Sequence, residues 1–413
     1  MILLRIKLIN SDMNIQMLIP EFKTIPYEEI KFGNDFPITV FDDLVIDFLA
    51  ELGRNILKDR DINRFPAAAA LAHWLRKVNI KQIKEENECI FNYKNISINP
   101  SGIVFHVCPS NVDTMFIYSL AISLLAGNKN ILRVSKKMDS FLMNRLFSIF
   151  NEIIKLEKYS LLRNYITVVQ YGYEEEINSY FSLQADARII WGGDKTINAL
   201  KNIPSKPRVR DFYFSDRVSF AIFNLNEFFK NDLSERNILI RKFYNDTYTF
   251  DQKGCSSPQR IFFFGETNQI QQFYEELSSY VETNYETDIT SISSLKLNNQ
   301  IQDSLNFQID SVFNKNNYLT LIESDHFNIE TCGAGYFYFK RINKIDEIID
   351  FIDKKVQTIT HYGLSHEQIK NLQQKTYGKG IDRIVEVGNA LDFNYIWDGY
   401  NLFSELVQKQ YIK

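Results

Sequence analysis

The sequence predicts an α/β protein in which a doubly wound parallel sheet forms a nucleotide-binding domain and a second α/β domain follows it. Two observations support this class. From Gly102 onward, short apolar runs alternate with amphipathic segments of helical period, which is typical of βαβ units. The alternation starts again after a stretch rich in proline and charge at 204–217, and a chain of 413 residues is long enough for two domains.

The N-terminal part is expected to form an irregular or strand-like arm at 1–35, followed by helices at 42–57 and 65–78. The nucleotide-binding domain should then contain strands at 103–107, 131–134, 166–169 and 187–191, and helices at 112–125, 139–156 and 174–183. Ligands of such sheets bind at the carboxyl ends of the strands, so a cofactor site is expected on the loops that follow them.

The same two periods predict a second α/β unit. Its expected elements are strands at 219–223, 260–264 and 335–340, and helices at 225–244, 269–281 and 346–355. Residues 287–316 are polar and weakly patterned, and we expect a surface insertion there. The predicted domains are 1–214 for the arm, helices and nucleotide-binding domain, 215–378 for the catalytic domain, and 379–413 for a C-terminal return to the first domain.

The composition, with 45% hydrophobic and 24% charged residues, is that of an ordinary globular protein. A net charge of -4 argues against a nucleic-acid partner. No apolar run reaches the length of a membrane span, and charges interrupt the first residues too early for a signal peptide. The four cysteines lie far apart and the five histidines lack metal-ligand spacing, so we expect neither a metal site nor a disulfide framework, and a cytoplasmic location.

Cys255 is the candidate nucleophile. Gly254 before it gives the backbone freedom, and Ser256 and Ser257 after it favour a turn or the start of a helix. At a helix N-terminus, a cysteine would be shifted toward its thiolate form. The alternative is that Cys255 is a small buried apolar residue, as lone cysteines usually are.

Five segments carry a resemblance to a known family. They are HVCPSNV at 106–112, AGN at 126–128 with ILRVS at 131–135, WGGDKT at 191–196, GCSSPQ at 254–259 and GIDRIVEVGNALDF at 380–393. Their order and spacing resemble the aldehyde dehydrogenase superfamily, and within it the long-chain acyl-CoA reductases (LuxC-type fatty acid reductases) of luciferase operons. The resemblance extends from about Gly102 to the C-terminus.

The resemblance implies an aldehyde-dehydrogenase-like fold and a set of catalytic residues. Cys255 would accept the acyl group, and the Asn111 side chain, together with the backbone N–H of the nucleophile, would stabilise the oxyanion. Asn111 could also cap the helix expected from Val112. His361 is a candidate acid or base, although a histidine in a loop is more often an ordinary polar residue.

The resemblance also implies a nicotinamide cofactor. Arg133 and the adjoining Ser135 would lie near the adenosine ribose, where a guanidinium would favour the 2′-phosphate of NADPH, and Lys136 and Lys137 would add positive charge. Arg133 could equally be a solvated strand-end residue.

The loop formed by Trp191, Gly192, Gly193 and Thr196 would approach the pyrophosphate, unless it is only a glycine turn. Glu330 would hold the nicotinamide ribose, although an ordinary surface glutamate is the competing interpretation.

One departure from the superfamily is informative. Hydrolytic aldehyde dehydrogenases carry a water-activating glutamate at the position of residues 211–220, and this chain has none there. Without that base the acyl-cysteine should persist until a hydride or an external thiol reaches it. The sequence therefore predicts an NADPH-dependent reductase of acyl-CoA, or of a thioester on an acyl carrier or acyl-protein synthetase, that is itself a homo-oligomer. The alternatives are a CoA-acylating aldehyde dehydrogenase that forms acyl-CoA and a non-reducing acyl-carrier or scaffold subunit.

Overall fold

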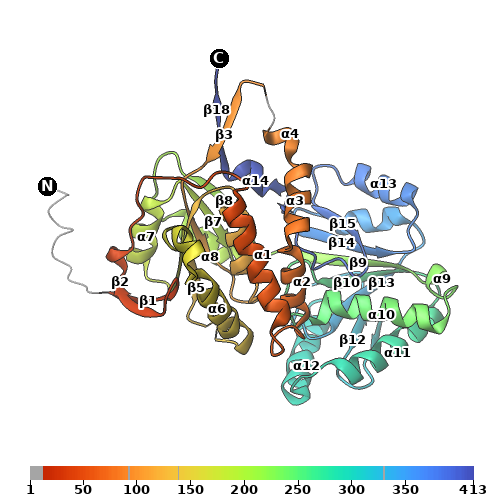
Figure 1. Ribbon diagram of the computed structural model, residues 1–413. Coiled ribbons are helices and arrows are strands. Elements are labelled where there is room, and N and C mark those ends of the chain that lie inside the picture. The colour runs from red at the N-terminus through yellow and green to blue at the C-terminus, as the bar shows by residue number, and fades with distance from the viewer. Residues whose placement is uncertain (1–12, 92–93, 138, 329–330) are drawn as a thin grey trace. The chain divides into compact units, whose positions relative to one another are not determined.

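The computed structural model describes residues 13–91, 94–137, 139–328 and 331–413. The chain forms two compact units, each built around a seven-stranded sheet (Figure 1). Unit 1 consists of Met1–Ser215 and Phe393–Lys413, and unit 2 consists of Asp216–Asp392. The predicted α/β class is confirmed.

The sheet of unit 1 has the strand order β2-β1-β6-β5-β4-β7-β8. Its five strands from β6 to β8 pair in parallel, whereas the β1–β2 hairpin is antiparallel and occupies one edge. The strands are β1 (Asn14–Ile19), β2 (Lys23–Pro26), β4 (Ile103–Val107), β5 (Lys129–Ser135), β6 (Ile166–Tyr171), β7 (Ala187–Trp191) and β8 (Arg210–Phe214). The expected strands at 103–107 and 187–191 have the bounds that the sequence predicts, because their apolar runs are buried on both sides.

Helices cover both faces of this sheet. One hydrophobic core contains residues of α1, α2, α5 and α6, and the core of the other face contains residues of α7 and α8. The helices of the unit are α1 (Asp43–Lys58), α2 (Pro66–Trp74), α3 (Lys77–Glu86), α4 (Glu88–Phe91), α5 (Met115–Leu125), α6 (Phe141–Ile154), α7 (Glu175–Gln184), α8 (Asp194–Lys201) and α14 (Leu402–Glu405), with 3₁₀ helices at Tyr27–Glu29 and Glu157–Asn164. Every residue of α5 is buried, so this helix is the centre of the unit.

The C-terminal segment adds two small antiparallel pairs to unit 1. Strand β3 (Ile96–Pro100) pairs with β18 (Val407–Tyr411), and β16 (Ile396–Trp397) pairs with β17 (Tyr400–Asn401). The β3–β18 ribbon projects from the body of the unit (Figure 1). The last residues thus return to the first unit, although later than expected.

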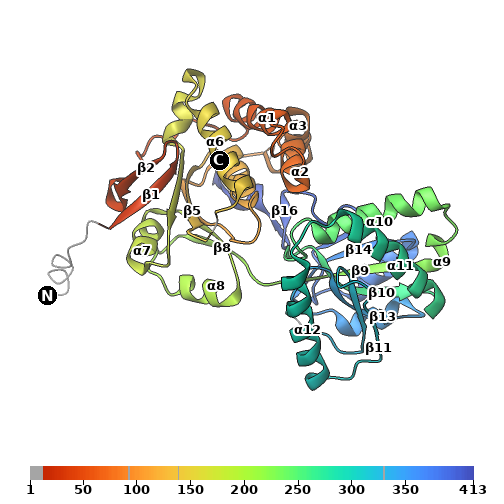
Figure 2. The ribbon, with the colours of Figure 1, turned by 90° about the horizontal axis from the view of Figure 1, so that it is seen from below.

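Unit 2 has the strand order β11-β12-β13-β10-β9-β14-β15, and only β11 runs antiparallel to its neighbour. The strands are β9 (Val218–Asn224), β10 (Pro258–Phe264), β11 (Ser311–Phe313), β12 (Thr320–Glu323), β13 (Tyr336–Arg341), β14 (Val356–Tyr362) and β15 (Arg383–Glu386). The helices are α9 (Leu225–Phe228), α10 (Leu233–Tyr248), α11 (Thr267–Asn284), α12 (Ile289–Asn306) and α13 (His366–Lys375), with a 3₁₀ helix at Ile345–Phe351. Residues of α10 and α11 pack on one face (Figure 2), and residues of α13 (Figure 1) and the 3₁₀ helix pack on the other.

Several sequence-based expectations need correction. The single helix expected at 225–244 is two helices, α9 and α10, and the helix expected at 346–355 is a 3₁₀ helix ending at Phe351. The stretch at 204–217 contains β8. The return to unit 1 begins at Phe393 rather than 379, because β15 pairs with β14 and keeps residues 379–392 in unit 2.

The polar segment at 287–316 is not a plain insertion, because it contains the long helix α12. Lys296 and Asp303 face inward and are 2% and 0% exposed, whereas Leu297 and Leu305 are 58% and 76% exposed. Polar residues of this helix thus face the interior of unit 2 and apolar residues face solvent, the reverse of the usual amphipathic pattern. A search for apolar residues at helical spacing therefore did not predict α12.

Candidate active site

Cys255 lies in a tight turn between α10 and β10, and its side chain is exposed. The Ser257 N–H donates to the Gly254 carbonyl at 2.9 Å and closes the turn. The expected turn is therefore present, but the alternative of a helix start is wrong, because strand β10 begins at Pro258. The sequence after Cys255 therefore provides no helix dipole that would favour its thiolate form.

Gln252 holds this turn in place. It has a left-handed backbone with φ 63°, next to Asp251 with φ 51°. Its buried side chain donates from Nε2 to the Pro258 carbonyl at 2.9 Å, and its Oε1 accepts the N–H groups of Gly335 and Tyr336 at 3.0 and 3.1 Å. The Gln252 side chain thus connects both ends of the Cys255 turn to the start of strand β13. Nothing in the neighbouring sequence indicates this role.

Ser219 fixes the backbone of Cys255 itself. Its hydroxyl donates to the Cys255 carbonyl at 2.7 Å and accepts the Thr358 N–H at 3.2 Å. Since Ser219 is fully buried on β9, the carbonyl of Cys255 is anchored to the central strands of the sheet. Sequence reasoning missed this residue as well.

The environments of the other three cysteines can be compared with that of Cys255. Burial raises the pKa of Cys108 to about 12, despite the nearby charge of Arg133. Burial likewise raises the pKa of Cys332 to about 11. Both groups are held as thiols at neutral pH, and thiols are poor nucleophiles. Cys89 is exposed on α4 in unit 1.

Asn111 lies exposed in the loop that follows β4 in unit 1. Helix α5 begins at Met115, and Thr114 occupies its N-cap position. The alternative role of Asn111 as a cap for a helix from Val112 is therefore wrong. The oxyanion-binding role of the exposed Asn111 stays a prediction.

The predicted cofactor residues of unit 1 converge on one edge of its sheet. Val107 pairs with Arg133 on β5 and with Ile190 on β7, so these three strands end side by side. Asn111 follows the first strand, Ser135 ends the second and Trp191 ends the third. The topology brings these positions to the carboxyl edge, where doubly wound sheets bind ligands.

Arg133 is more enclosed than we expected. Its residue is 4% exposed, its Nη2 donates to the carbonyls of Tyr171 and Gly172 at 3.3 and 2.7 Å, and its guanidinium lies 4.9 Å from the ring centre of Tyr173. Its buried Nε has no hydrogen-bond partner among the described residues. Ser135 is also occupied, because its hydroxyl accepts the Lys137 N–H at 3.2 Å.

The loop after β7 leads directly into the N-terminus of α8. Gly193 is the N-cap of α8, and a Cβ on Gly192 would lie 3.2 Å from the Thr196 side chain, so the loop requires glycine for this close packing. The indole of Trp191, by contrast, is buried, stacks on Phe214 at 3.8 Å and donates to Ser119 at 3.2 Å. Only the backbone of Trp191 is therefore placed to contact a ligand.

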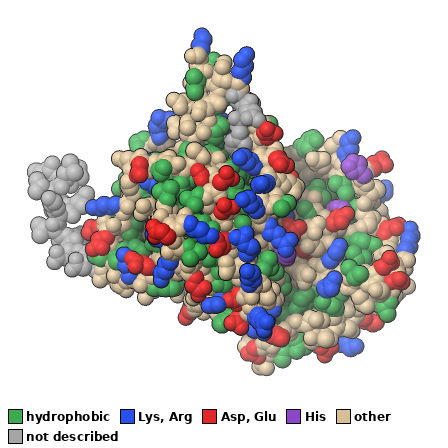
Figure 3. Space-filling view, in the orientation of Figure 1, with side chains coloured by type: hydrophobic (Ala, Val, Ile, Leu, Met, Phe, Trp, Pro, Cys, Tyr) green, Lys and Arg blue, Asp and Glu red, His purple; other side chains and the backbone are tan. Residues whose placement is uncertain are grey.

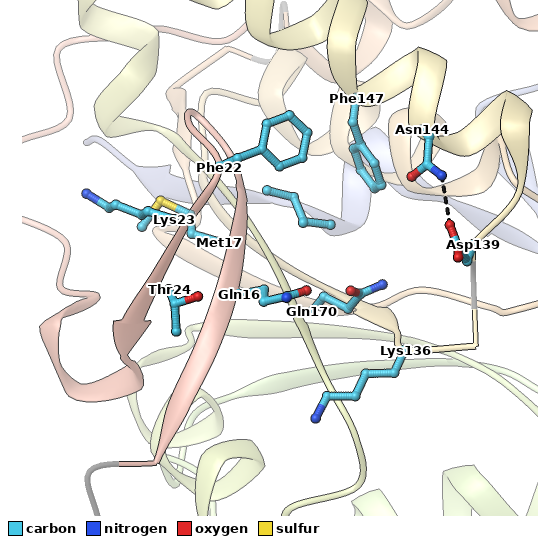
Figure 4. Close-up of a pocket in the computed structure, with 11 residues that line it drawn as sticks. Gln16, Met17, Phe22, Lys23, Thr24, Lys136, Asp139, Asn144, Phe147 and Gln170 are labelled. Atoms are coloured by element: carbon cyan, nitrogen blue, oxygen red, sulfur yellow. Dashed lines mark hydrogen bonds between the residues drawn. The ribbon is translucent and has the colours of Figure 1, made fainter.

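A cavity of about 530 Å³ lies beside this edge of unit 1 (Figure 4). It is bounded by the β1–β2 hairpin and by α6, and the rings of Phe22 and Phe147 flank it. Two cationic side chains, Lys23 and Lys136, line it together with the amide of Gln170. Lys136 directly follows Ser135, and its Nζ lies 3.9 Å from a carboxylate oxygen of Glu174.

His361 does not lie next to Cys255 in the sheet of unit 2. It pairs with Ile222 on β9, whereas Ser219, which anchors Cys255, lies three residues earlier on the same strand. At the rise of a β-strand this places His361 roughly 10 Å farther along the sheet. Burial lowers its pKa, and the carboxylate of Glu386 only partly offsets that effect. Glu330 lies outside the described residues.

Solved structures that share this fold include several aldehyde dehydrogenases. An aldehyde dehydrogenase from Brucella melitensis biovar abortus 2308 superposes with a TM-score of 0.65 over 97% of this chain and 93% of its own, at 12% identity. Lactaldehyde dehydrogenase from Escherichia coli gives 0.60 over 89% and 85%, at 12% identity. A betaine aldehyde dehydrogenase point mutant from Staphylococcus aureus in complex with NAD+ gives 0.62 over 93% and 86%, at 11% identity. The fold is therefore that of the aldehyde dehydrogenases.

A family model narrows this class. The model of the acyl-CoA reductase (LuxC) family matches residues 70–409. The chain belongs to the acyl-CoA reductase (LuxC) family, and it is an oxidoreductase with an aldehyde-dehydrogenase-like fold. A comparison with curated proteins found no match.

Two further features of the described residues bear on function. Their His, Cys, Asp and Glu side chains form no group of three that could hold a metal ion. Of the helices that can be described, none has both the length and the apolar character that a membrane crossing requires. On the face shown in Figure 3, acidic and basic side chains are interspersed.

Proposed function

We propose that this protein reduces a long-chain acyl thioester to an aldehyde, with an acyl group carried on Cys255 and with NADPH as the reductant. The observation that carries the proposal is Cys255 itself, an exposed thiol whose turn is pinned by Gln252 and Ser219. Membership of the acyl-CoA reductase family supports the reaction class.

In the proposed mechanism the Cys255 thiolate attacks the carbonyl carbon of the donor thioester. The carbon–sulfur bond of the donor breaks, the donor thiol leaves, and an acyl-cysteine thioester remains. When bound, the reduced nicotinamide supplies a hydride to that carbonyl carbon. The Asn111 amide and the Cys255 backbone N–H stabilise the oxyanion, which collapses to the aldehyde as Cys255 departs as a thiolate.

The segment 211–220 supports reduction over hydrolysis, because it carries no glutamate and its Ser219 donates to the Cys255 carbonyl. Asp211 has the only acidic side chain on β8, and Arg188 donates to both of its oxygens, at 2.7 and 2.5 Å, while the Tyr213 hydroxyl donates at 2.6 Å. Burial opposes ionisation of Asp211, but these hydrogen bonds and the guanidinium charge outweigh it and lower its pKa. Asp211 is thus occupied within unit 1, and the start of β9 offers no glutamate base, so an acyl-cysteine should be long-lived.

The residues at the carboxyl edge of unit 1 fit a nicotinamide dinucleotide. The Gly192-Gly193 start of α8 can accept a pyrophosphate, since helix N-termini bind anions. For the 2′-phosphate, we propose Lys136 in place of Arg133, because the Arg133 guanidinium already donates to two carbonyls, whereas the Lys136 side chain is 64% exposed beside the cavity.

We also propose that the protein is a homo-oligomer. The β3–β18 ribbon is a two-stranded sheet with an open edge on each strand among the described residues, and Tyr411 on it is 68% exposed. Edges of this kind pair readily with another strand. Light scattering of the purified chain tests this proposal.

The reaction is tested by mixing the protein with tetradecanoyl-CoA and NADPH and measuring aldehyde and CoA. The proposal expects both products, and it expects a Cys255→Ala variant to form neither. Acyl-protein without aldehyde would instead indicate an acyl-carrier subunit. Preferred formation of acyl-CoA from aldehyde, CoA and NADP+ would indicate a CoA-acylating dehydrogenase.

A further inference from the structure

The loop of residues 387–392, which follows β15, packs against the residue before the nucleophile. A Cβ built on Gly254 would lie 3.7 Å from Cδ2 of Leu391 and 3.7 Å from Cδ2 of Phe250. Both apolar side chains are only half-buried. Two apolar surfaces therefore meet directly beside the Cys255 turn, within unit 2.

Asp246 holds this loop from one side. It lies on the last turn of α10, is 1% exposed, and accepts the N–H groups of Gly388 and Ala390 at 2.6 and 3.0 Å. Gly388 has φ 105°, and a Cβ there would lie 3.0 Å from the Lys242 side chain, so the loop passes close over the helix. A buried carboxylate with two backbone donors is a strong local anchor.

Arg383 holds the loop from the other side. Its guanidinium donates to the carbonyls of Ala390, Asn389 and Asp392 at 3.0, 3.1 and 3.3 Å. Backbone N–H groups of the loop thus donate to Asp246, and backbone carbonyls of the loop accept from Arg383. This arrangement fixes the backbone on both sides of Leu391.

We propose that Asp246 is a positioning residue that holds Leu391 in place as an apolar contact for the chain of the acyl group on Cys255. This inference rests on the proposed acylation of Cys255 and adds to it the residues that contact a long acyl chain. Short acyl groups end before they reach such a contact, so they should not depend on it.

The test compares kcat/KM for tetradecanoyl-CoA with kcat/KM for butanoyl-CoA in Asp246→Asn and Leu391→Ala variants. The measured quantity is the ratio of the two values, because a general loss of folded protein leaves that ratio unchanged. We expect each variant to lower this ratio about tenfold, the effect typical of a lost apolar contact. The control is Asp232→Asn, because Asp232 also accepts a backbone N–H, that of Glu235 at 2.9 Å, but at the opposite end of α10.

Leu391→Ala keeps the backbone bonds of the loop, so it tests the contact even if Asp246→Asn fails to fold. An unchanged ratio in both variants would overturn the proposal, whether the two substrates lose activity equally or lose none. If the wild type is acylated at Cys255 and the ratio is unchanged, only this inference fails. If Cys255 is not acylated in the wild type, the proposed function fails with it.

A pH series adds a second measurement. Protonation of Asp246 would remove one of its acceptors, and the charged groups that face it are Arg383, Asp392 and, near Gly388, Lys242. We expect the substrate ratio of the wild type to fall toward that of Asp246→Asn as the pH decreases from about 8 to about 6. A ratio for the wild type that is independent of pH over this range would contradict the role of the carboxylate.

Discussion

The reactivities of the cysteines provide a direct test of the site. Burial raises the pKa of Cys332 from 9.0 to about 11 and that of Cys108 from 9.0 to about 12. Each unit of pKa reduces the thiolate fraction at pH 8 about tenfold, so the two fractions fall by roughly 10² and 10³ relative to an unperturbed thiol. Iodoacetamide should therefore alkylate Cys255 and Cys89, both exposed, far faster than it alkylates the other two.

The assay is a time course of alkylation at pH 8 in the native protein, followed by peptide mass spectrometry at each cysteine. A second time course with a radioactive acyl donor separates the two exposed thiols, because only Cys255 lies in the pinned turn. We expect Cys255→Ala to lose acyl labelling and Cys89→Ala to keep it. Alkylation of Cys108 at the rate of Cys255, or full acylation of the Cys255→Ala protein, would refute the reasoning.

Other perturbations test the oxyanion contact, the cofactor site and the Asp246 carboxylate. Asn111→Ala should lower turnover per folded molecule about 10²-fold, because the amide would stabilise charge that develops only in the transition state and it does not cap α5; single-turnover rates beside thermal melts check this. Lys136→Ala should raise KM for NADPH about tenfold and leave KM for NADH unchanged, whereas loss of both cofactors alike would exclude the 2′-phosphate contact. Burial, partly offset by two backbone N–H groups, raises the pKa of Asp246 from 3.8 to about 7, so its contribution to stability is present below pH 4 and lost as the pH rises to 7. Relative to Asp246→Asn, the wild type should lose about 4 kcal/mol of unfolding free energy at most over that range, as urea denaturation would measure.

Strands β4 to β7 of unit 1 and strands β9, β10 and β13 of unit 2 were predictable, because their apolar runs are buried on both faces of a sheet. Strands β8, β11, β12, β14 and β15 were not predicted. The run at 103–107 is apolar and buried, so its length and its period indicate the same element. Helix α12 was not predictable in this way. Its inward residues Lys296 and Asp303 find polar partners, a carbonyl of Asn317 at 2.7 Å and the Tyr336 hydroxyl at 2.6 Å, that lie far away in the sequence.

The residues of the candidate site also fall into those that their sequence neighbours indicate and those that only the fold brings together. Cys255 could be singled out from its neighbours, because glycine and serine around a cysteine indicate an exposed turn. Gln252, Ser219 and Asp246 could not, since each acts through a backbone group brought close only by the fold. Trp191 is the converse case. It belongs to a recognisable motif, but its side chain lies in the core.

These contacts also bear on why an acyl-cysteine could accumulate in this protein. The nucleophile needs an exposed sulfur, whereas the thioester must be kept from an activated water. Ser219 and Gln252 meet the first need by anchoring only backbone groups of the turn, so the Cys255 side chain stays exposed. The start of β9 in the same unit bears on the second, because the sequence Asp216-Arg217-Val218-Ser219-Phe220 contains no glutamate and Ser219 is already bonded to the Cys255 carbonyl. An accessible thiol, with no glutamate at the start of β9 that could activate water, favours attack of a hydride on the acyl group over attack of water.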